Sequence, residues 1–571
     1  MKKLIYLSLL LMIQNAYSQV RIESSVNINL LKKEYVPVLI YFKDQADLSA
    51  IEANWTKAQK GNYVYHQLKE KANTTQKNII HYLISKNIKY QSFFIANSIK
   101  AEINAKQLSE LSQFNEVKSI LYDVPLQVEQ VQLDLNAESA QTRTAEITWG
   151  LKNIQAIDVW NQGYEGQGVT VAGADTGYKW DVAGIKERYR GWNDSTVNHA
   201  YHWHDAIHNI SPLANDSINP CGLNLKEPCD DNGHGTHTAG TMLGKTDDFF
   251  YGVAPRAKWI GCRNMERGNG APSTYIECFE FFLAPTDSLN QNPKPELAPH
   301  VINNSWYCSV SEGCNLSNFE VMHTVIKNLK AAGIVVVVSA GNQGNSCSSI
   351  AHPPAMFEES FSIGSFAIND TISGFSAMGP VIIDSSYRIK PNVVAPGSGV
   401  ISRTKEGNLE AWNGTSMAGP HVAGLVALII SANPSLAGKV DIIENIIEST
   451  SRYADSHIQC DTFSSTQRPN NMYGFGKINA LEAVNKARVF VNVENENKLN
   501  SNFIIQPNPG QDYFEILSQN PLGQIWIYNS IGQLMVHDNT ANHQKQIQSA
   551  SWEKGIYFIK IQNKTILWSK I

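Results

Sequence analysis

The chain has 571 residues, more than one hydrophobic core normally supports, so we expect several domains. Hydrophobic residues make up 43% and charged residues 17% of the sequence, as in soluble globular proteins, and the formal net charge is −5. This weakly acidic balance gives no polyanion-binding surface, so no nucleic-acid partner is expected.

Residues 1–18 have the pattern of a secretory signal peptide. Lys2 and Lys3 precede the apolar run Leu4 to Ile13, and Ala16-Tyr17-Ser18 supplies small residues for cleavage. A membrane anchor is the alternative, but the run is too short because a spanning helix needs about 20 apolar residues. We therefore expect export.

Residues 19–123 form the first predicted domain. Its predicted order is strand, helix, strand, strand, helix, strand, over Val36 to Phe42, Tyr63 to Ser85, Ile88 to Phe94, Ser98 to Ile103, Ala105 to Gln113 and Val117 to Tyr122. This β-α-β-β-α-β order predicts a ferredoxin-like α+β domain. Residues 124–146 are polar and rich in Gln, Glu and Thr, which predicts a linker open to proteolytic processing.

Residues 147–488 alternate predicted strands and helices. The strands are Gly168 to Ala174, Trp259 to Cys262, His300 to Asn303 and Gly333 to Ser339, and the helices are Gly235 to Leu243, Ile276 to Leu283 and Val321 to Ala332. The uninterrupted apolar run 334–338 is typical of a strand buried on both faces. The fold class is therefore α/β, a parallel sheet flanked by helices.

All 8 cysteines lie in this α/β domain, at positions 221, 229, 262, 278, 308, 314, 347 and 460. An even number in an exported chain predicts disulfides. Cys221 with Cys229 and Cys308 with Cys314 are plausible local pairs, but the sequence leaves the connectivity open. A zinc site is the alternative, and the absence of any C-x-x-C pair in the sequence argues against it.

Three glycine-flanked motifs carry the candidate chemistry. Asp175-Thr176-Gly177 closes an apolar strand, His234 lies in Asn232-Gly233-His234-Gly235-Thr236-His237, and Ser416 opens an apolar helical run. A serine hydroxyl is a poor nucleophile until a base removes its proton, and a carboxylate orients such a base. Alone, Ser416 would be a helix-capping serine and Asp175 a turn aspartate. Together the motifs predict a Ser-His-Asp triad.

This order of Asp, His and Ser resembles that of the subtilisin-like serine proteases, or subtilases, and the resemblance runs from Trp149 to Ala487. It implies a serine endopeptidase in which Ser416 is the nucleophile, His234 the general base and Asp175 the orienting carboxylate. His237 is the alternative base, and the resemblance places it beneath the helix instead.

The resemblance also assigns the oxyanion hole and the substrate-binding segments. Asn342 matches the oxyanion asparagine of the family, with the backbone N–H of Ser416 as second donor. An extended peptide substrate is expected to add as a strand between two segments. The candidate substrate-binding residues are Gly268, Gly270, Ser305, Trp306, Ala340 and Gly341.

Two departures from the family pattern stand out. Tyr307 replaces a glycine beside the expected S1 pocket, where Ala351 and His352 form the base, and its side chain would either narrow the pocket or point outward. The segment between Asp175 and His234 is unusually long. Its His202, His204 and Asp205 would bind a metal or, as we expect, lie in a surface insertion stapled by a disulfide. We expect no metal ligand and no required cofactor, and leave structural calcium open because no Asp-rich loop supplies a ligand set.

By position, residues 19–123 resemble a subtilase propeptide, which implies a zymogen inhibited by its own propeptide. The alternative is an independent accessory domain. Residues 489–501 are a charged, Asn-rich linker.

Residues 502–571 are predicted all-β, a small sandwich with strands at Phe503 to Ile505, Tyr513 to Ile516, Gln524 to Tyr528, Leu534 to His537, Gly555 to Ile561 and Thr565 to Trp568. Gln506-Pro507-Asn508-Pro509, Gly532-Gln533-Leu534 and Gly555-Ile556-Tyr557-Phe558 resemble the C-terminal sorting domain of the type IX secretion system. This implies passage through the periplasm and contact with outer-membrane secretion machinery. A carbohydrate-binding or adhesive sandwich is the alternative.

The sequence thus predicts a secreted or cell-surface serine endopeptidase that is made as a zymogen and hydrolyses polypeptides through an acyl-enzyme. Two other hypotheses remain. The chain could be a catalytically silent adhesin that keeps the fold for binding, or a processing enzyme restricted to one partner protein.

Overall fold

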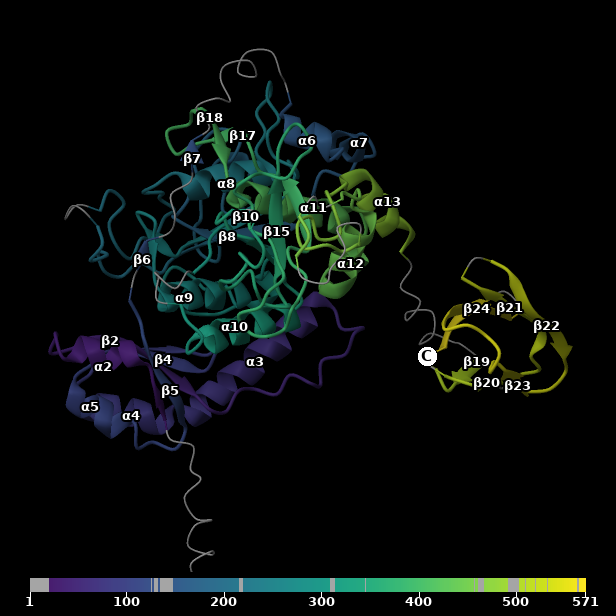
Figure 1. The fold of residues 1–571 in the computed structure, drawn as a ribbon, viewed down its shortest axis with the longest axis horizontal. Coiled ribbons are helices and arrows are strands. Elements are labelled where there is room, and N and C mark those ends of the chain that lie inside the picture. Colours follow the sequence, from purple (N-terminus) through teal and green to yellow (C-terminus); the bar gives the residue numbers. More distant parts are fainter. Residues whose placement is uncertain are drawn as a thin grey trace, which may run out of the picture. The chain divides into compact units, whose positions relative to one another are not determined.

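The computed structural model forms two compact units, Met1–Arg488 and Val489–Ile571 (Figure 1). It describes residues 20–124, 126–127, 132–133, 147–214, 219–308, 314–344, 346–455, 458–460, 467–490, 503–508, 510–518, 520–530, 532–561 and 564–570. The predicted signal peptide and most of the two predicted linkers, 124–146 and 489–501, lie outside the described residues.

A five-stranded sheet in the order β1-β5-β2-β4-β3 forms the N-terminal part of the first unit. The strands β2 (Val36–Phe42), β3 (Tyr90–Phe93), β4 (Ser98–Ile103) and β5 (Val117–Tyr122) alternate with α3 (Lys57–Thr75), α4 (Lys77–Ser85) and α5 (Ala105–Leu111), which confirms the ferredoxin-like order. The short α2 (Ser24–Leu30) precedes them, and β1 (Arg21–Ile22) adds in parallel to β5.

The helix predicted over residues 63–85 is in fact two helices. The break falls at Gln76, a buried residue whose Nε2 donates to the Phe93 carbonyl oxygen at 3.0 Å. That contact fixes the helices to strand β3, so tertiary packing, and no local sequence signal, sets the break.

The main sheet is seven-stranded and parallel, in the order β16-β15-β14-β13-β8-β10-β9. Its predicted strands are confirmed as β8 (Thr170–Asp175), β10 (Lys258–Arg263), β13 (Val301–Asn304) and β14 (Val335–Ser339). Helices α8 (His234–Leu243) and α11 (Thr415–Ala432) pack on one side, and α9 (Pro272–Leu283) and α10 (Phe319–Ala331) on the other (Figure 1). The domain also contains α6 (Trp149–Asn153), α7 (Ala156–Trp160), α12 (Val440–Thr450) and α13 (Ala480–Val489).

Three strands of this sheet have no counterpart in the sequence prediction: β9 (Trp203–Asp205), β15 (Phe361–Phe366) and β16 (Val393–Pro396). Strand β9 corrects the expectation of a surface insertion between Asp175 and His234. It pairs with β10, and all its residues are buried, so this part of the insertion is a structural edge of the sheet.

Helix α11 is long and apolar enough to cross a membrane, but 89% of it is buried inside the protein. Its apolar residues therefore belong to the hydrophobic core of the protein, and Ser416 lies in its first turn.

Four disulfides join Cys221–Cys229, Cys262–Cys278, Cys308–Cys314 and Cys347–Cys460. Both predicted local pairs are confirmed. The other two join positions that only the fold brings together, β10 to α9 and two distant loops.

Two antiparallel sheets form the second unit, β19-β20-β23 and β22-β21-β24-β25. The strands are β19 (Phe503–Gln506), β20 (Tyr513–Ser518), β21 (Gly523–Asn529), β22 (Leu534–Thr540), β23 (Gln544–Gln548), β24 (Gly555–Ile561) and β25 (Lys564–Lys570). Phe514 and Ile547 of the first sheet share a core with Ile525 and Trp568 of the second, as in a β-sandwich. Strand β23 was not predicted, because only Ile547 marks its buried face.

Candidate active site

The carboxyl ends of the central strands bring Asp175 and His234 together. Asp175 ends strand β8 and is 1% exposed, and His234 is the first residue of helix α8 and 7% exposed. His234 Nδ1 lies 2.7 Å from Asp175 Oδ1. This contact holds Nδ1 toward the carboxylate and leaves Nε2 to face a reacting group.

Asp230 holds the turn that carries His234. Its Oδ1 accepts hydrogen bonds from the backbone N–H groups of Asn232 and Gly233 and from the Thr176 hydroxyl, and its Oδ2 accepts from both donors of Thr236. One buried carboxylate therefore fixes the start of α8 and ties it to the strand end that bears Asp175. Asp230 was not among the predicted site residues, although its place before a glycine-rich helix start is typical of a cap.

Two opposing effects set the pKa of His234. Burial lowers it, but the charge and hydrogen bond of Asp175, with a further contribution from Asp230, outweigh burial and raise the net pKa above the ordinary value. The site thus stabilises the imidazolium, which a general base becomes when it accepts a proton.

His237, the alternative base, lies in a different environment. It is fully buried, its ring stacks on Trp412 at 4.4 Å between centroids, and its Nε2 lies 3.2 Å from the Glu410 carbonyl oxygen. Burial lowers its pKa to about 3. The His237 side chain of helix α8 is therefore buried against Trp412 and Glu410, whereas His234 is the histidine that contacts Asp175.

Ser416 lies in the first turn of α11 and is 6% exposed. Its Oγ donates to the Ser305 carbonyl oxygen at 3.1 Å, and the Ser305 hydroxyl donates to the Ser416 carbonyl oxygen at 2.8 Å. Among the described residues no hydrogen bond joins Ser416 to His234. The first N–H groups of a helix have no partner within it, so this turn offers donors and a positive dipole end.

Asn342 follows strand β14 and reaches the same turn. Its Oδ1 accepts hydrogen bonds from the backbone N–H and the hydroxyl of Thr415, both at 2.9 Å, and the Thr415 hydroxyl accepts one from the Gly341 N–H at 3.2 Å. These contacts fix the amide so that its Nδ2 is the end left to donate. Thr415 is thus a second residue that the sequence analysis missed.

The predicted substrate-binding residues separate into two groups. Ser305 directly follows β13, and Ala340 and Gly341 directly follow β14. Ser305 and Gly341 hydrogen-bond to the first residues of α11. Trp306 does not present its side chain there, because its ring stacks on Tyr275 at 4.0 Å and its Nε1 donates to the Ala174 carbonyl oxygen. Tyr307 is 8% exposed and stacks on His352 at 5.6 Å, so the departure from glycine packs an aromatic ring against the predicted pocket base.

Gly268 and Gly270 belong to a short hairpin already paired with the chain itself. Its second strand, β12 (Asn269–Gly270), lies antiparallel to β6 (Leu126–Gln127). Strand β18 (Leu409–Asn413), which precedes Ser416 along the chain, pairs with both β17 (Val400–Arg403) and β7 (Gln132–Leu133). The segment after the N-terminal sheet therefore adds one strand to β12 and another to β18.

The candidate metal ligands of the insertion each contact a different side chain. His202 accepts from Arg190, His204 Nε2 lies 2.7 Å from Glu277, and Asp205 faces Arg263. Within the described residues, no group of three or more His, Cys, Asp or Glu side chains is placed to hold a metal ion.

Comparison with known proteins assigns two parts of the chain to families. The sequence profile of the subtilase family matches residues 166–476. This chain belongs to the subtilase family. The profile of the secretion system C-terminal sorting domain matches residues 504–571. The subtilase family consists of serine-type endopeptidases, and the sorting domain indicates export to the cell surface or the medium.

Curated relatives extend the match. Bacillopeptidase F of Bacillus subtilis (strain 168) is 34% identical over 505 residues, covering 83% of this subtilase and 33% of the relative. Subtilisin-like protease 3 of Arthroderma benhamiae is 28% identical over 338 residues, which cover 58% of this chain and 70% of the relative. The cuticle-degrading serine protease of Arthrobotrys oligospora is 31% identical over 226 residues, which cover 39% of this chain and 48% of the relative. The match thus spans a third of Bacillopeptidase F.

Proposed function

We propose that this subtilase is a secreted serine endopeptidase, made as a zymogen, that hydrolyses polypeptides through a Ser416–His234–Asp175 triad. The 2.7 Å contact between His234 Nδ1 and Asp175 Oδ1, at the strand ends that face Ser416, is the observation that carries the proposal. A subtilase domain without activity would have no need to keep a buried imidazole paired to a buried carboxylate.

The mechanism follows from these positions. Ser416 Oγ turns from the Ser305 carbonyl toward His234 Nε2, gives up its proton and attacks the peptide carbonyl. The Ser416 N–H and Asn342 Nδ2 donate to the oxyanion, and the imidazolium, stabilised by Asp175, protonates the leaving amine. Water activated by the same imidazole then hydrolyses the acyl-enzyme.

Residues 19–123 act as the propeptide in this proposal. Their sheet packs on α9 and α10, where Glu280 accepts backbone hydrogen bonds from Phe94 and Ile95, and Asn328 donates to the Ile95 carbonyl oxygen. Leu39, Leu121 and Val325 are buried in one shared core. The following segment pairs with β12 and then with β18, the two edges that a peptide substrate would use.

A bound propeptide in this position blocks substrate, which supports an inhibited zymogen. Because β6 ends at Gln127 and β7 begins at Gln132, we place the maturation cut within residues 127–132. The C-terminal domain is proposed to engage outer-membrane secretion machinery.

We propose no required cofactor, because the side chains above supply nucleophile, base and oxyanion donors. Activity that survives dialysis against EDTA is expected, and structural calcium would show itself as a lower Tm after that treatment with kcat unchanged at low temperature.

A fluorophosphonate reagent tests the triad directly. We expect it to label Ser416 of the mature enzyme, identified by peptide mass, and to block casein hydrolysis in proportion. His234→Ala should lose both the label and the activity. A silent adhesin would take no label, and labelling at another serine would remove Ser416 from the mechanism.

A further inference from the structure

A turn of residues 230–233, the histidine turn, leads directly into helix α8 and His234. Asp230, its first residue, ties the turn to the end of strand β8. Asp231, its second residue, has a different partner, because its Oδ2 lies 3.1 Å from Arg263 Nη2. The aspartate is 7% exposed and the arginine is fully buried. Neighbouring carboxylates thus fasten one turn to two adjacent strands, β8 and β10.

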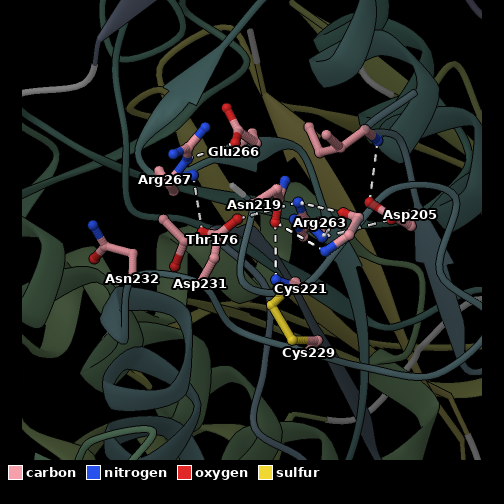
Figure 2. Close-up of polar contacts among 12 residues, drawn as sticks. Thr176, Asp205, Asn219, Cys221, Cys229, Asp231, Asn232, Arg263, Glu266 and Arg267 are labelled. Carbon is pink, nitrogen blue, oxygen red and sulfur yellow. Dashed lines mark hydrogen bonds and ion pairs between the residues drawn. A yellow bond between two sulfur atoms is a disulfide. The ribbon is translucent and has the colours of Figure 1, made fainter. Parts of the chain in front are cut away.

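Arg263 ends strand β10 and pairs in register with Asp175 of β8 and Asp205 of β9. Its Nη1 lies 3.7 Å from Asp205 Oδ2, and both of its terminal nitrogens donate to the Gly222 carbonyl oxygen at 3.2 Å. Figure 2 shows Arg263 between Asp205 and Asp231. One buried guanidinium therefore joins the edge strand of the sheet, the loop that follows this strand and the histidine turn.

The Cys221–Cys229 disulfide closes the same loop at a second place (Figure 2). Gly222, whose carbonyl oxygen accepts from Arg263, directly follows Cys221, and Cys229 directly precedes Asp230. The disulfide therefore holds the start of the loop against its end, and the guanidinium holds that loop to the strand beside the one that carries the triad aspartate.

The charge of Arg263 also decides the state of Asp231. Burial raises the pKa of Asp231 to about 7, and the guanidinium is the largest influence that lowers it. Removing one partner of a buried ion pair leaves an uncompensated charge. Without Arg263, the carboxylate would take up a proton or move toward water, and either change would release the histidine turn from β10.

We propose that Arg263 is a positioning residue for the reaction: through Asp231 it fixes the histidine turn, and so places the His234 imidazole relative to Ser416. The inference rests on the proposed endopeptidase function, in which His234 Nε2 must reach the Ser416 hydroxyl. Helix α8 begins at His234, so a shift of the turn moves the imidazole with it. A displacement of a reacting group by about 1 Å can cost about 10²-fold in rate.

A double-mutant cycle with Arg263→Met, Asp231→Asn and the two together tests the proposal. We expect Arg263→Met to lower kcat of the mature enzyme about 10- to 100-fold with KM within about twofold, because a misplaced base weakens the transition state more than substrate binding. Fluorophosphonate labelling of Ser416 should slow by the same factor. The double variant should be no slower than Arg263→Met, because a residue that acts through another adds no separate loss.

The full-length protein gives the same comparison without a substrate-binding step. The rate at which each variant removes its own N-terminal domain, followed by intact mass, should fall by the factor seen in kcat. Arg263→Lys keeps the charge but lacks the fork that reaches Asp231 and Gly222 together, so its rates should lie between those of wild type and Arg263→Met. Where Arg263→Met does not fold, Arg263→Lys carries the comparison.

Arg190→Met is the matched control. Arg190 is a half-buried arginine whose terminal nitrogens donate to the carbonyl oxygens of Leu297 and Tyr201, and among the described residues it has no hydrogen bond or ion pair to the histidine turn. Its loss should lower Tm and leave kcat and the labelling rate within about twofold of wild type. Thermal unfolding of each variant shows that the fold is intact at the assay temperature.

The outcomes separate the two proposals. If wild type neither hydrolyses casein nor takes the label, the endopeptidase function fails. If wild type is active and a folded Arg263→Met, or in its place Arg263→Lys, keeps the wild-type kcat and labelling rate, the positioning role fails. It also fails if Arg190→Met loses both rates as fully, or if the losses of the single variants multiply in the double variant.

Discussion

Single carboxylates organise the candidate site at the residue scale. Asp175 contacts His234, the proposed base, and Asp230 fixes the turn that carries His234. The sequence motifs singled out Asp175, His234 and Ser416, because each lies beside glycines at a strand or helix end, and the structure brings Asp175 and His234 into contact. Their catalytic roles stay a prediction. The motifs could not indicate the contacts of Thr415 with Asn342 or of Asp230 with Thr176, which join distant parts of the chain, nor that Trp306 turns into the core.

The raised pKa of His234 predicts the pH dependence of activity. A general base acts in its neutral form, so kcat/KM should fall as the pH drops through a midpoint above about 6.5, the ordinary value for histidine. In Asp175→Asn the carboxylate charge is gone while burial remains, so the midpoint should move to lower pH and kcat should drop strongly. A pH–rate profile with casein checks both. An unchanged midpoint in the variant would mean that His234 is not the base.

Asn342 should matter for the transition state more than for substrate binding. Asn342→Ala removes the Nδ2 donor, and we expect kcat to fall by about 10²–10³ with KM little changed. Steady-state kinetics on a peptide substrate measure the split. Gln343→Ala is the neighbouring control, since that side chain is exposed. A loss confined to KM would argue against an oxyanion role.

Elements set by strong periodicity or long apolar runs were predictable from sequence, and those set by tertiary pairing were not. Strand β14 and helix α11 are mostly apolar, so their burial could be predicted from the sequence. Strand β9 has the polar sequence Trp203-His204-Asp205 and forms only because β10 offers it an edge. Strand β16 is short and follows a polar loop, so no local alternation marks it.

The start of helix α8 depends on a close approach between two backbones. A Cβ on Gly235 would lie 2.0 Å from the Gly177 carbonyl oxygen, so Gly235→Ala must push α8 away from the strand that carries Asp175. We expect kcat to drop more than tenfold and Tm to fall by several degrees, which activity and thermal unfolding measure together. Gly374→Ala is the control, because its added methyl group meets no atom within 4 Å and its φ, like that of Gly235, is not in the left-handed region. Wild-type activity in Gly235→Ala would refute the need for this contact.

At the scale of the whole molecule, the N-terminal domain that we propose as the propeptide packs against the protease domain. The N-terminal sheet shares a hydrophobic core with α9 and α10, and the segment that follows it pairs with β12 and with β18. The ferredoxin-like order was readable from the sequence, and the family resemblance implied a propeptide that docks on the protease. The contacts that make this docking were not readable, because they depend on side chains such as Glu280 and Asn328 that carry no local signal.

Intact-mass analysis of purified wild-type protein beside Ser416→Ala tests the central claim most directly. We predict that wild type cuts itself within residues 127–132, so that its mature N-terminus falls in that interval, and that Ser416→Ala keeps the N-terminal domain. The mutant mass also reports whether the signal peptide has been removed. Processing of Ser416→Ala at the same position, in the absence of any other protease, would contradict the account.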